Sequence, residues 1–134
     1  MQHHARGPFD VKLAPLETYN KAPEAKLARM SLDKHFHGDL DATSQGEMLS
    51  SGSAKDSGGY VAIERVTGTL QGRSGSFALM HNATMTRGAP YLNIVVVPGS
   101  GSGELAGISG KMNIEIAAGG AHSYDFEYAF DAAP

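Results

Sequence analysis

The sequence contains no cysteine, no long hydrophobic run and no stretch with the periodicity of an amphipathic helix. Without cysteine, the fold can use neither disulfide bonds nor thiolate chemistry. The apolar runs are far too short to cross a membrane as a helix, and the amino terminus lacks the apolar segment of a secretory signal peptide. We therefore expect a cytoplasmic protein without a membrane partner.

An excess of positive charge is also missing, since 11 lysines and arginines stand against 14 aspartates and glutamates. The net charge of −3 and the isoelectric point near 6.0 argue against a nucleic-acid partner. Metal-site patterns are incomplete as well. His35 and His37 share one strand face, but no further ligand follows at a suitable spacing. We expect neither a metal nor a cofactor.

Glycine, in contrast, is abundant, with 17 residues in a chain of 134. Between the glycines, apolar and polar residues alternate with the period of two that is typical of β-strands. A chain of this length is most economically one domain, here residues 1–134 with an ordered core over about 7–130.

The alternation predicts eight strands and no helix. In chain order they cover residues 9–13, 27–36, 46–53, 60–67, 76–86, 91–97, 111–117 and 122–130. Short turns between successive strands favour an antiparallel meander. Eight strands can close into a small barrel, which removes exposed edges and leaves an interior filled by side chains or just wide enough for one small ligand. The sequence thus predicts an all-β, eight-stranded antiparallel barrel, with an open two-sheet sandwich as the alternative.

A repeated pattern, Gly-x-Leu-x-Gly-x-Ser-Gly-x-Φ-x-Φ with Φ a large apolar residue, marks the turns. Its copies are Gly68–Leu79 and Gly103–Ile114, and a looser copy with one inserted residue begins at Gly38. Each copy lies between two predicted strands, where glycine can supply the positive φ and the close backbone approach that tight hairpins require. The repeat also shows which residues of sister hairpins share a face.

Seven segments carry a resemblance to a known family. They are Phe9–Leu13, Phe36–Leu40, Gly46–Leu49, Tyr60–Gly68, Gly75–Leu79, Gly103–Gly107 and His122–Tyr124. With them, the chain from about Phe9 to Phe130 resembles a bacterial family of uncharacterised domains that is classed with the allene oxide cyclase-like β-barrels. The resemblance implies an eight-stranded barrel and no established activity. The distant plant cyclases act on an unsaturated epoxide inside their barrel, but none of their active-site residues matches a position in this sequence.

His81 is a polar residue in a position that the repeat makes apolar. In one copy the apolar face runs Phe77, Leu79 and then His81. The other copy has Ile116 at the place of His81, and side chains two apart share a face. A histidine that faces a barrel interior can act as a general acid or base because its pKa lies near neutrality. The alternative is a core histidine that is bonded to a backbone carbonyl.

Glu64 and Lys34 stand at comparable places, each four residues before a glycine that opens a copy of the pattern. Inside an apolar barrel, the pKa of Glu64 would be raised unless a cation lay nearby. Lys34, Arg65 or protonated His81 could be that cation. The candidate catalytic residues are therefore Glu64 and His81, which could transfer a proton as a pair.

The predicted strand 60–67 is apolar on both faces, so its register stays open. In one register Tyr60 and Glu64 face inward, whereas in the other Glu64 is exposed and Arg65 faces inward. A surface or structural role of Glu64 is the simpler interpretation. The candidate ligand-binding residues near this strand are Lys34, Arg65 and Tyr60.

Aromatic residues recur at every second position of the last predicted strand, at Tyr124, Phe126, Tyr128 and Phe130. The simplest interpretation is that they belong to the core. In the functional alternative, the hydroxyls of Tyr124 or Tyr128 orient a ligand at the mouth of the barrel. Asn82 is a weaker ligand-binding candidate of the same polar type.

The function that these observations favour is binding of a small apolar molecule inside the barrel. Isomerase or cyclase chemistry led by Glu64 and His81 is one alternative. The other is a non-catalytic structural or interaction domain that forms a homo-oligomer. In that case strand 91–97 or 122–130, each apolar on both faces, would cover the interface.

Overall fold

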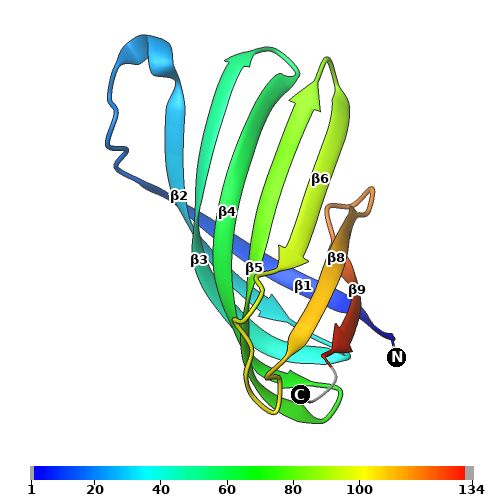
Figure 1. Cartoon of the computed structure of the whole chain (residues 1–134). Coiled ribbons are helices and arrows are strands. Elements are labelled where there is room, and N and C mark those ends of the chain that lie inside the picture. The colour runs from blue at the N-terminus through cyan, green and yellow to red at the C-terminus, as the bar shows by residue number, and fades with distance from the viewer. Residues whose placement is uncertain (1, 132–134) are drawn as a thin grey trace.

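The computed structural model describes residues 2–131. Nine antiparallel strands belong to one sheet (Figure 1). They are β1 (His3–Leu16), β2 (Leu27–Phe36), β3 (Leu40–Ala54), β4 (Ser57–Leu70), β5 (Arg73–Thr86), β6 (Ala89–Val96), β7 (Ser102–Gly103), β8 (Ile108–Ile116) and β9 (His122–Phe130). Within the described range, helical structure is limited to the single 3₁₀ turn η1 (Pro23–Ala25) between β1 and β2.

Eight of the strands close into a ring. The order is β1, β2, β3, β4, β5, β6, β8 and β9, and β9 pairs again with β1. The short β7 stays outside this ring and pairs with the start of β5. The predicted eight-stranded antiparallel barrel is thereby confirmed, and the open sandwich is not the fold of this chain.

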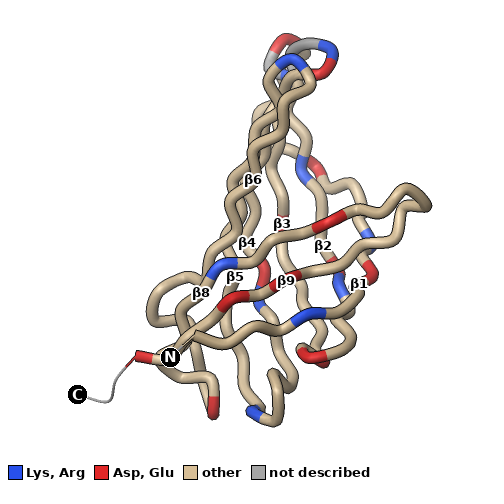
Figure 2. Tube along the Cα trace, turned by 90° about the vertical axis from the view of Figure 1, so that its right-hand side faces the viewer, with Lys and Arg blue, Asp and Glu red and all other residues tan. Residues whose placement is uncertain are grey.

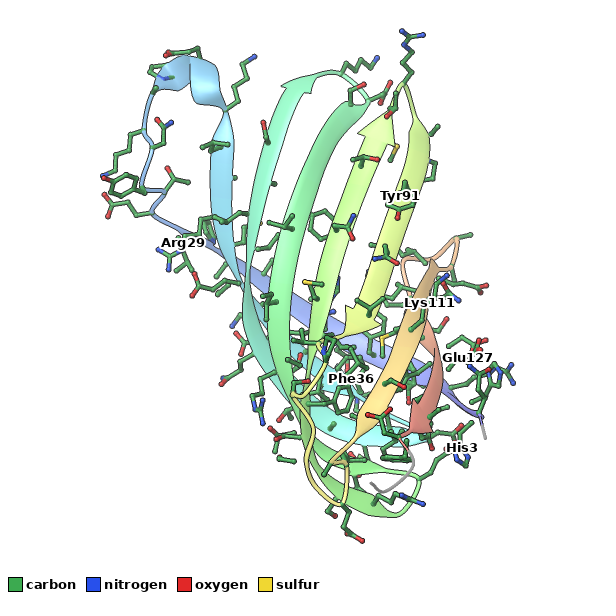
Figure 3. The ribbon with its side chains drawn as sticks, viewed as in Figure 1. His3, Arg29, Phe36, Tyr91, Lys111 and Glu127 are labelled. Atoms are coloured by element: carbon green, nitrogen blue, oxygen red, sulfur yellow. The ribbon has the colours of Figure 1, made fainter. Side chains whose placement is uncertain are left out.

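The barrel has two different ends, which we call the packed end and the open end. At the packed end all eight strands surround the core, and Phe36 lies inside it (Figure 3). At the open end the hairpins β3–β4 and β5–β6 extend beyond β8 and β9 (Figure 1). There β6 has little support from β8, because these strands share only the pairs Ile94–Met112 and Val95–Lys111. A side view shows β3 to β6 rising to tips that carry charges of both signs (Figure 2).

The core consists of buried side chains from every strand of the ring and of Leu105, which lies between β7 and β8. Its members are Ala5, Phe9, Phe36, Leu40, Ala42, Val66, Leu70, Phe77, Leu79, Ile94, Val96, Leu105, Ile108, Met112, Tyr124, Phe126 and Tyr128. Phe126 stacks on Phe77 and on Tyr128, with ring centroids 5.6 and 5.3 Å apart. The aromatic positions of the last strand therefore stabilise the packed end, as the simplest interpretation predicted.

The repeated pattern has a physical basis in the two full copies. Leu70 and Leu105 are both buried, while Gly72 and Gly107 both form turns with positive φ angles of 88° and 81°. The predicted alignment of the looser copy, which begins at Gly38, with the two full copies is wrong. Gly38, with a φ of 86°, forms the turn itself and so corresponds to Gly72 rather than to the first glycine of the pattern.

Several strands are longer than predicted. β1 begins at His3 because its first half pairs with β9, although Gly7 and Pro8 interrupt the alternation there. β1 also continues through Pro15, where it pairs with β2 alone, so the missing N–H of proline leaves no gap in the ladder. The segment 54–59, which lies between two predicted strands, instead belongs largely to the extended tip of β3 and β4.

Candidate functional site

The register of β4 places Glu64 inside the barrel. Ala62, Glu64 and Val66 are buried, whereas Val61 and Ile63 on the opposite face are more than half exposed. Arg65 belongs to the outer face and donates a 2.6 Å hydrogen bond to the Ser76 hydroxyl. Of the two registers that the sequence left open, the one with Glu64 inward is therefore correct.

The carboxylate of Glu64 is the centre of a buried polar cluster, which we call the Glu64 cluster. Lys34 Nζ lies 2.7 Å and His81 Nε2 lies 2.6 Å from Oε2. The hydroxyl of Ser44 donates a 2.7 Å hydrogen bond to Oε1. All four side chains are buried, and they come from the neighbouring strands β2, β3, β4 and β5.

The sheet register explains how these side chains meet. Lys34 pairs with Ser44, and the next inward residue on β3, Gly46, stands directly opposite Glu64. A Cβ atom at Gly46 would overlap the carbonyl oxygen of Ile63 on β4. Glycine at this position therefore allows β3 and β4 to approach closely, while Lys34 reaches from β2 to Oε2 of Glu64.

The partners of Glu64 determine its charge. Burial raises the pKa of this carboxyl, but the hydrogen bond from His81 and the charge and hydrogen bond of Lys34 outweigh it and lower the pKa to about 2. Glu64 is thus an anion paired with the Lys34 ammonium. The ammonium also lies 5.4 Å from the ring centroid of Phe9 and 5.8 Å from that of Phe36, within the range of cation–π attraction.

A cavity opens directly beyond this cluster, at the open end of the barrel. Its volume is about 500 Å³. The inward-facing side chains that line it are Met48, Ser50, Tyr60, Ala83, Met85, Leu92 and Ile116. Two of them connect the cavity with the cluster. Ala83 is the next inward residue after His81 on β5, and the Tyr60 ring lies 6.3 Å from the imidazole of His81.

Tyr60 is half buried between the cavity and the Glu64 cluster. Burial raises the pKa of its hydroxyl, and the negative charge of Glu64 raises it further. Tyr60 is therefore a neutral hydroxyl at physiological pH, which can both donate and accept a hydrogen bond.

The remaining candidate residues lie elsewhere. Asn82 is on the outer face, where its side-chain oxygen accepts a 3.1 Å hydrogen bond from Asn93. The hydroxyl of Tyr124 accepts a 2.8 Å hydrogen bond from the Leu40 amide at the packed end. The hydroxyl of Tyr128 donates to the side chain of Gln71, in the β4–β5 turn. The structure thus brings Lys34, Tyr60, Glu64 and His81 together, but places Arg65, Asn82, Tyr124 and Tyr128 away from them.

The comparison of His81 with Ile116 correctly predicts that both side chains face the barrel interior, but it does not predict how deeply each is buried. Both side chains face inward, yet Ile116 is 66% exposed at the rim of the cavity and His81 is 3% exposed. Ser44 is the member of the Glu64 cluster that sequence reasoning missed. Its inward orientation could have been predicted, because Ser44 alternates with the apolar residues Leu40, Ala42 and Met48 on one face of β3.

Other kinds of site find little support in the described part of the chain. Across residues 2–131, no three His, Asp or Glu side chains are grouped so that they could hold a metal ion. The imidazoles of His35 and His37 are neighbours, with ring centroids 4.1 Å apart, but no third ligand accompanies them. Within the same range, no helix has the length and apolar character needed to span a membrane.

The fold and the site define a class of protein, a small closed β-barrel with a buried charge cluster beneath an apolar open end. The sequence profile described as "Protein of unknown function (DUF3224)" matches residues 5–128. The chain belongs to this DUF3224 family. The family assignment agrees with the predicted resemblance to a family without an established activity.

A solved structure is closely similar to this chain. It is a protein with unknown function from the DUF3224 family of Shewanella oneidensis MR-1, with 49% sequence identity and a TM-score of 0.93. The similarity covers 99% of this chain and 100% of the Shewanella chain. A comparison with proteins of curated function gives no match.

The stability of the barrel should depend on every member of the Glu64 cluster keeping its partner. The variant Glu64→Gln leaves the buried Lys34 ammonium without a counter-charge, and we expect it to lower the free energy of unfolding by about 3–5 kcal/mol. Replacing all four members with apolar residues (Lys34→Met, Ser44→Ala, Glu64→Met, His81→Met) should leave stability within about 2 kcal/mol of wild type. Urea unfolding followed by circular dichroism measures both. Equal stability of Glu64→Gln and wild type would contradict the buried ion pair.

The lowered pKa of Glu64 also predicts that the free energy of unfolding falls at acidic pH. Its pKa falls from 4.5 to about 2 on folding, so the stabilisation is complete above the unfolded-state pKa. It is lost as pH falls from about 5 to about 2, and it amounts to about 3 kcal/mol. Urea unfolding at a series of pH values measures this loss. The fourfold apolar variant is the control, and it should lose less stability over this interval than wild type does.

Proposed function

We propose that the protein binds a small, predominantly apolar molecule in the cavity at the open end of the barrel. One observation carries the proposal: the inward-facing residues of this end are apolar, yet they remain exposed to solvent. Met85, Leu92 and Ile116 are 41%, 38% and 66% exposed. Apolar side chains that line a concave surface without packing against one another favour occupation by an apolar guest.

The dimensions and the chemistry of the cavity suit such a guest. Its volume of about 500 Å³ lies in the range of small-molecule sites, which typically combine apolar walls with few polar groups. Polar groups are scarce here too. Among the inward-facing side chains, Ser50 and Tyr60 contribute hydroxyls. The barrel mouth is also a usual place for a ligand in small β-barrels.

Binding of the neutral fluorescent probe N-phenyl-1-naphthylamine tests this proposal. We expect saturable binding to wild type, and a Kd raised at least about tenfold by Ala83→Trp, because the indole fills the cavity. Asn82→Trp is the matched control, since its indole would stand on the outer face of the same strand, and it should bind as wild type does. Absence of saturable binding to wild type, or equal binding by Ala83→Trp, would overturn the proposal.

A second function, self-association, is favoured by the outer face of the barrel. Five apolar side chains from β2 to β5 are exposed there, namely Leu27, Leu49, Val61, Ile63 and Met80. Leu49 pairs with Val61, and Ile63 pairs with Met80, so the apolar strip is continuous across three strands.

The charges beside this strip suit a second copy of the same chain. Arg29 and Glu47 form an exposed ion pair there, and Arg29 points away from the barrel (Figure 3). Two-fold symmetry repeats every contact, so an Arg29–Glu47 contact across such an interface would form twice. The outer face of β9 instead carries Ser123, Asp125 and Glu127, so we propose an interface on β2 to β5 rather than on β9.

Sedimentation velocity tests the interface. We expect wild type to sediment as an oligomer and Ile63→Glu as a monomer, because the carboxylate would be desolvated in the interface. The control is Tyr19→Glu, which changes a fully exposed residue of the β1–β2 loop and should leave the oligomer intact. Monomeric wild type at high concentration would contradict self-association.

An isomerase or cyclase activity of Glu64 and His81 stays a prediction, as does the relation to the allene oxide cyclase-like barrels. Proximity of the two groups supports an acid–base role, because Glu64 holds His81 in place through a 2.6 Å contact. Turnover would additionally require a substrate that reaches the imidazole from the cavity.

A further inference from the structure

One polar atom of the Glu64 cluster has no partner. In the described part of the chain, Nδ1 of His81 is the single buried side-chain nitrogen or oxygen without a hydrogen bond. An unpaired buried polar group costs about 1–3 kcal/mol, so such atoms are rare in stable interiors. The other polar atoms at the centre of the cluster are bonded to one another.

The protonation of His81 follows from its partner. Glu64 is ionised and can only accept, so Nε2 of His81 must carry the proton in their 2.6 Å contact. Lys34 already neutralises Glu64 at 2.7 Å. A second buried cation would lack a counter-charge, so we assign His81 the neutral imidazole. In the neutral Nε2–H tautomer, Nδ1 is a bare acceptor with an unused lone pair.

The strands beside His81 supply no donor to this lone pair. The imidazole stands between Ala62 on β4 and Ile94 on β6, its partners in the sheet register. Along β5 the next inward residue is Ala83, which lines the cavity. None of these side chains can donate a hydrogen bond. Ala62 and Ala83 each present only a methyl group beside His81, which is itself 3% exposed.

We propose that Nδ1 of His81 is the hydrogen-bond acceptor at the deep end of the cavity, and that the ligand is an apolar molecule with one neutral hydroxyl donor, an alcohol or a phenol. This inference rests on the proposed ligand-binding function and names the ligand class of the same site. The hydroxyl supplies the partner that Nδ1 lacks, while the apolar remainder of the ligand covers Met85, Leu92 and Ile116.

The charge of the cluster excludes other ligand head groups. A carboxylate ligand has no proton to donate to Nδ1 and would be repelled by Glu64. An ammonium ligand would bring a second positive charge next to a Glu64–Lys34 pair that is already neutral. A neutral donor meets neither penalty. A site that hydrogen-bonds a hydroxyl discriminates strongly against an analogue without it, because the polar group of the protein is then left unpaired.

Two probes of nearly equal shape test the inference, 2-naphthol with a hydroxyl and 2-methoxynaphthalene without a donor. We expect wild type to bind 2-naphthol at least about tenfold more tightly. His81→Leu should bind both probes equally, with its affinity for 2-methoxynaphthalene close to that of wild type. Equal affinities in wild type would overturn the hydroxyl acceptor but leave the proposed apolar site standing. Failure of wild type to bind either probe would overturn the site itself.

A spectroscopic measurement on wild type covers the case in which His81→Leu does not fold. With ¹⁵N-labelled histidine, the Nδ1 resonance of His81 should move on addition of 2-naphthol and stay in place with 2-methoxynaphthalene, since only the former donates a hydrogen bond. An Nδ1 resonance that does not respond while 2-naphthol binds would also overturn the inference.

Discussion

The hydrogen bonds and the ion pair of the Glu64 carboxylate join four neighbouring strands inside the barrel. A carboxylate in this place is tolerable only because Lys34, Ser44 and His81 reach it at 2.7, 2.7 and 2.6 Å. Each partner belongs to a different strand, so a slip of one strand by two residues would leave a buried charge or donor unpaired. The cluster therefore helps to fix the register of β2 to β5, in addition to any contribution to stability.

The position of the cluster also divides the interior into two parts with different chemistry. On one side, Phe36, Phe77 and Phe126 pack with the rest of the core and close the barrel. On the other side the strands diverge, and apolar side chains such as Leu92 and Ile116 face the interior without being buried. A fold that needed only stability would bury these residues against one another. Their exposure, next to an imidazole with an unused acceptor, is what supports the binding of a hydroxylated apolar molecule.

Much of this arrangement could be predicted from the sequence. Alternation gave the strands and their inward faces, and the comparison of repeat copies singled out His81 as polar in an apolar position. Lys34 and Glu64 were identified by the same kind of comparison. These predictions succeeded because a strand has only two faces, so the choice at each position is binary.

The rest could not be predicted because it depends on distances between strands. The apolar character of β4 on both faces hid which of Glu64 and Arg65 points inward, and only pairing with β3 and β5 decides it. Ser44 was missed although its alternation with apolar residues marks it as inward-facing, because alternation does not show which group its hydroxyl meets. The depth of His81 relative to Ile116 was also hidden, since β8 ends near the rim of the cavity whereas β5 continues past it.

The central claim is that Glu64 is a buried anion on which Lys34 and His81 are arranged. The most direct measurement is the ¹³C chemical shift of the Glu64 side-chain carboxyl, followed by NMR from pH 7 down to pH 3. The account predicts the shift of an ionised carboxylate throughout this range, because the pKa of Glu64 is about 2 in the folded protein. A titration with a midpoint near or above the ordinary glutamate value would contradict the account.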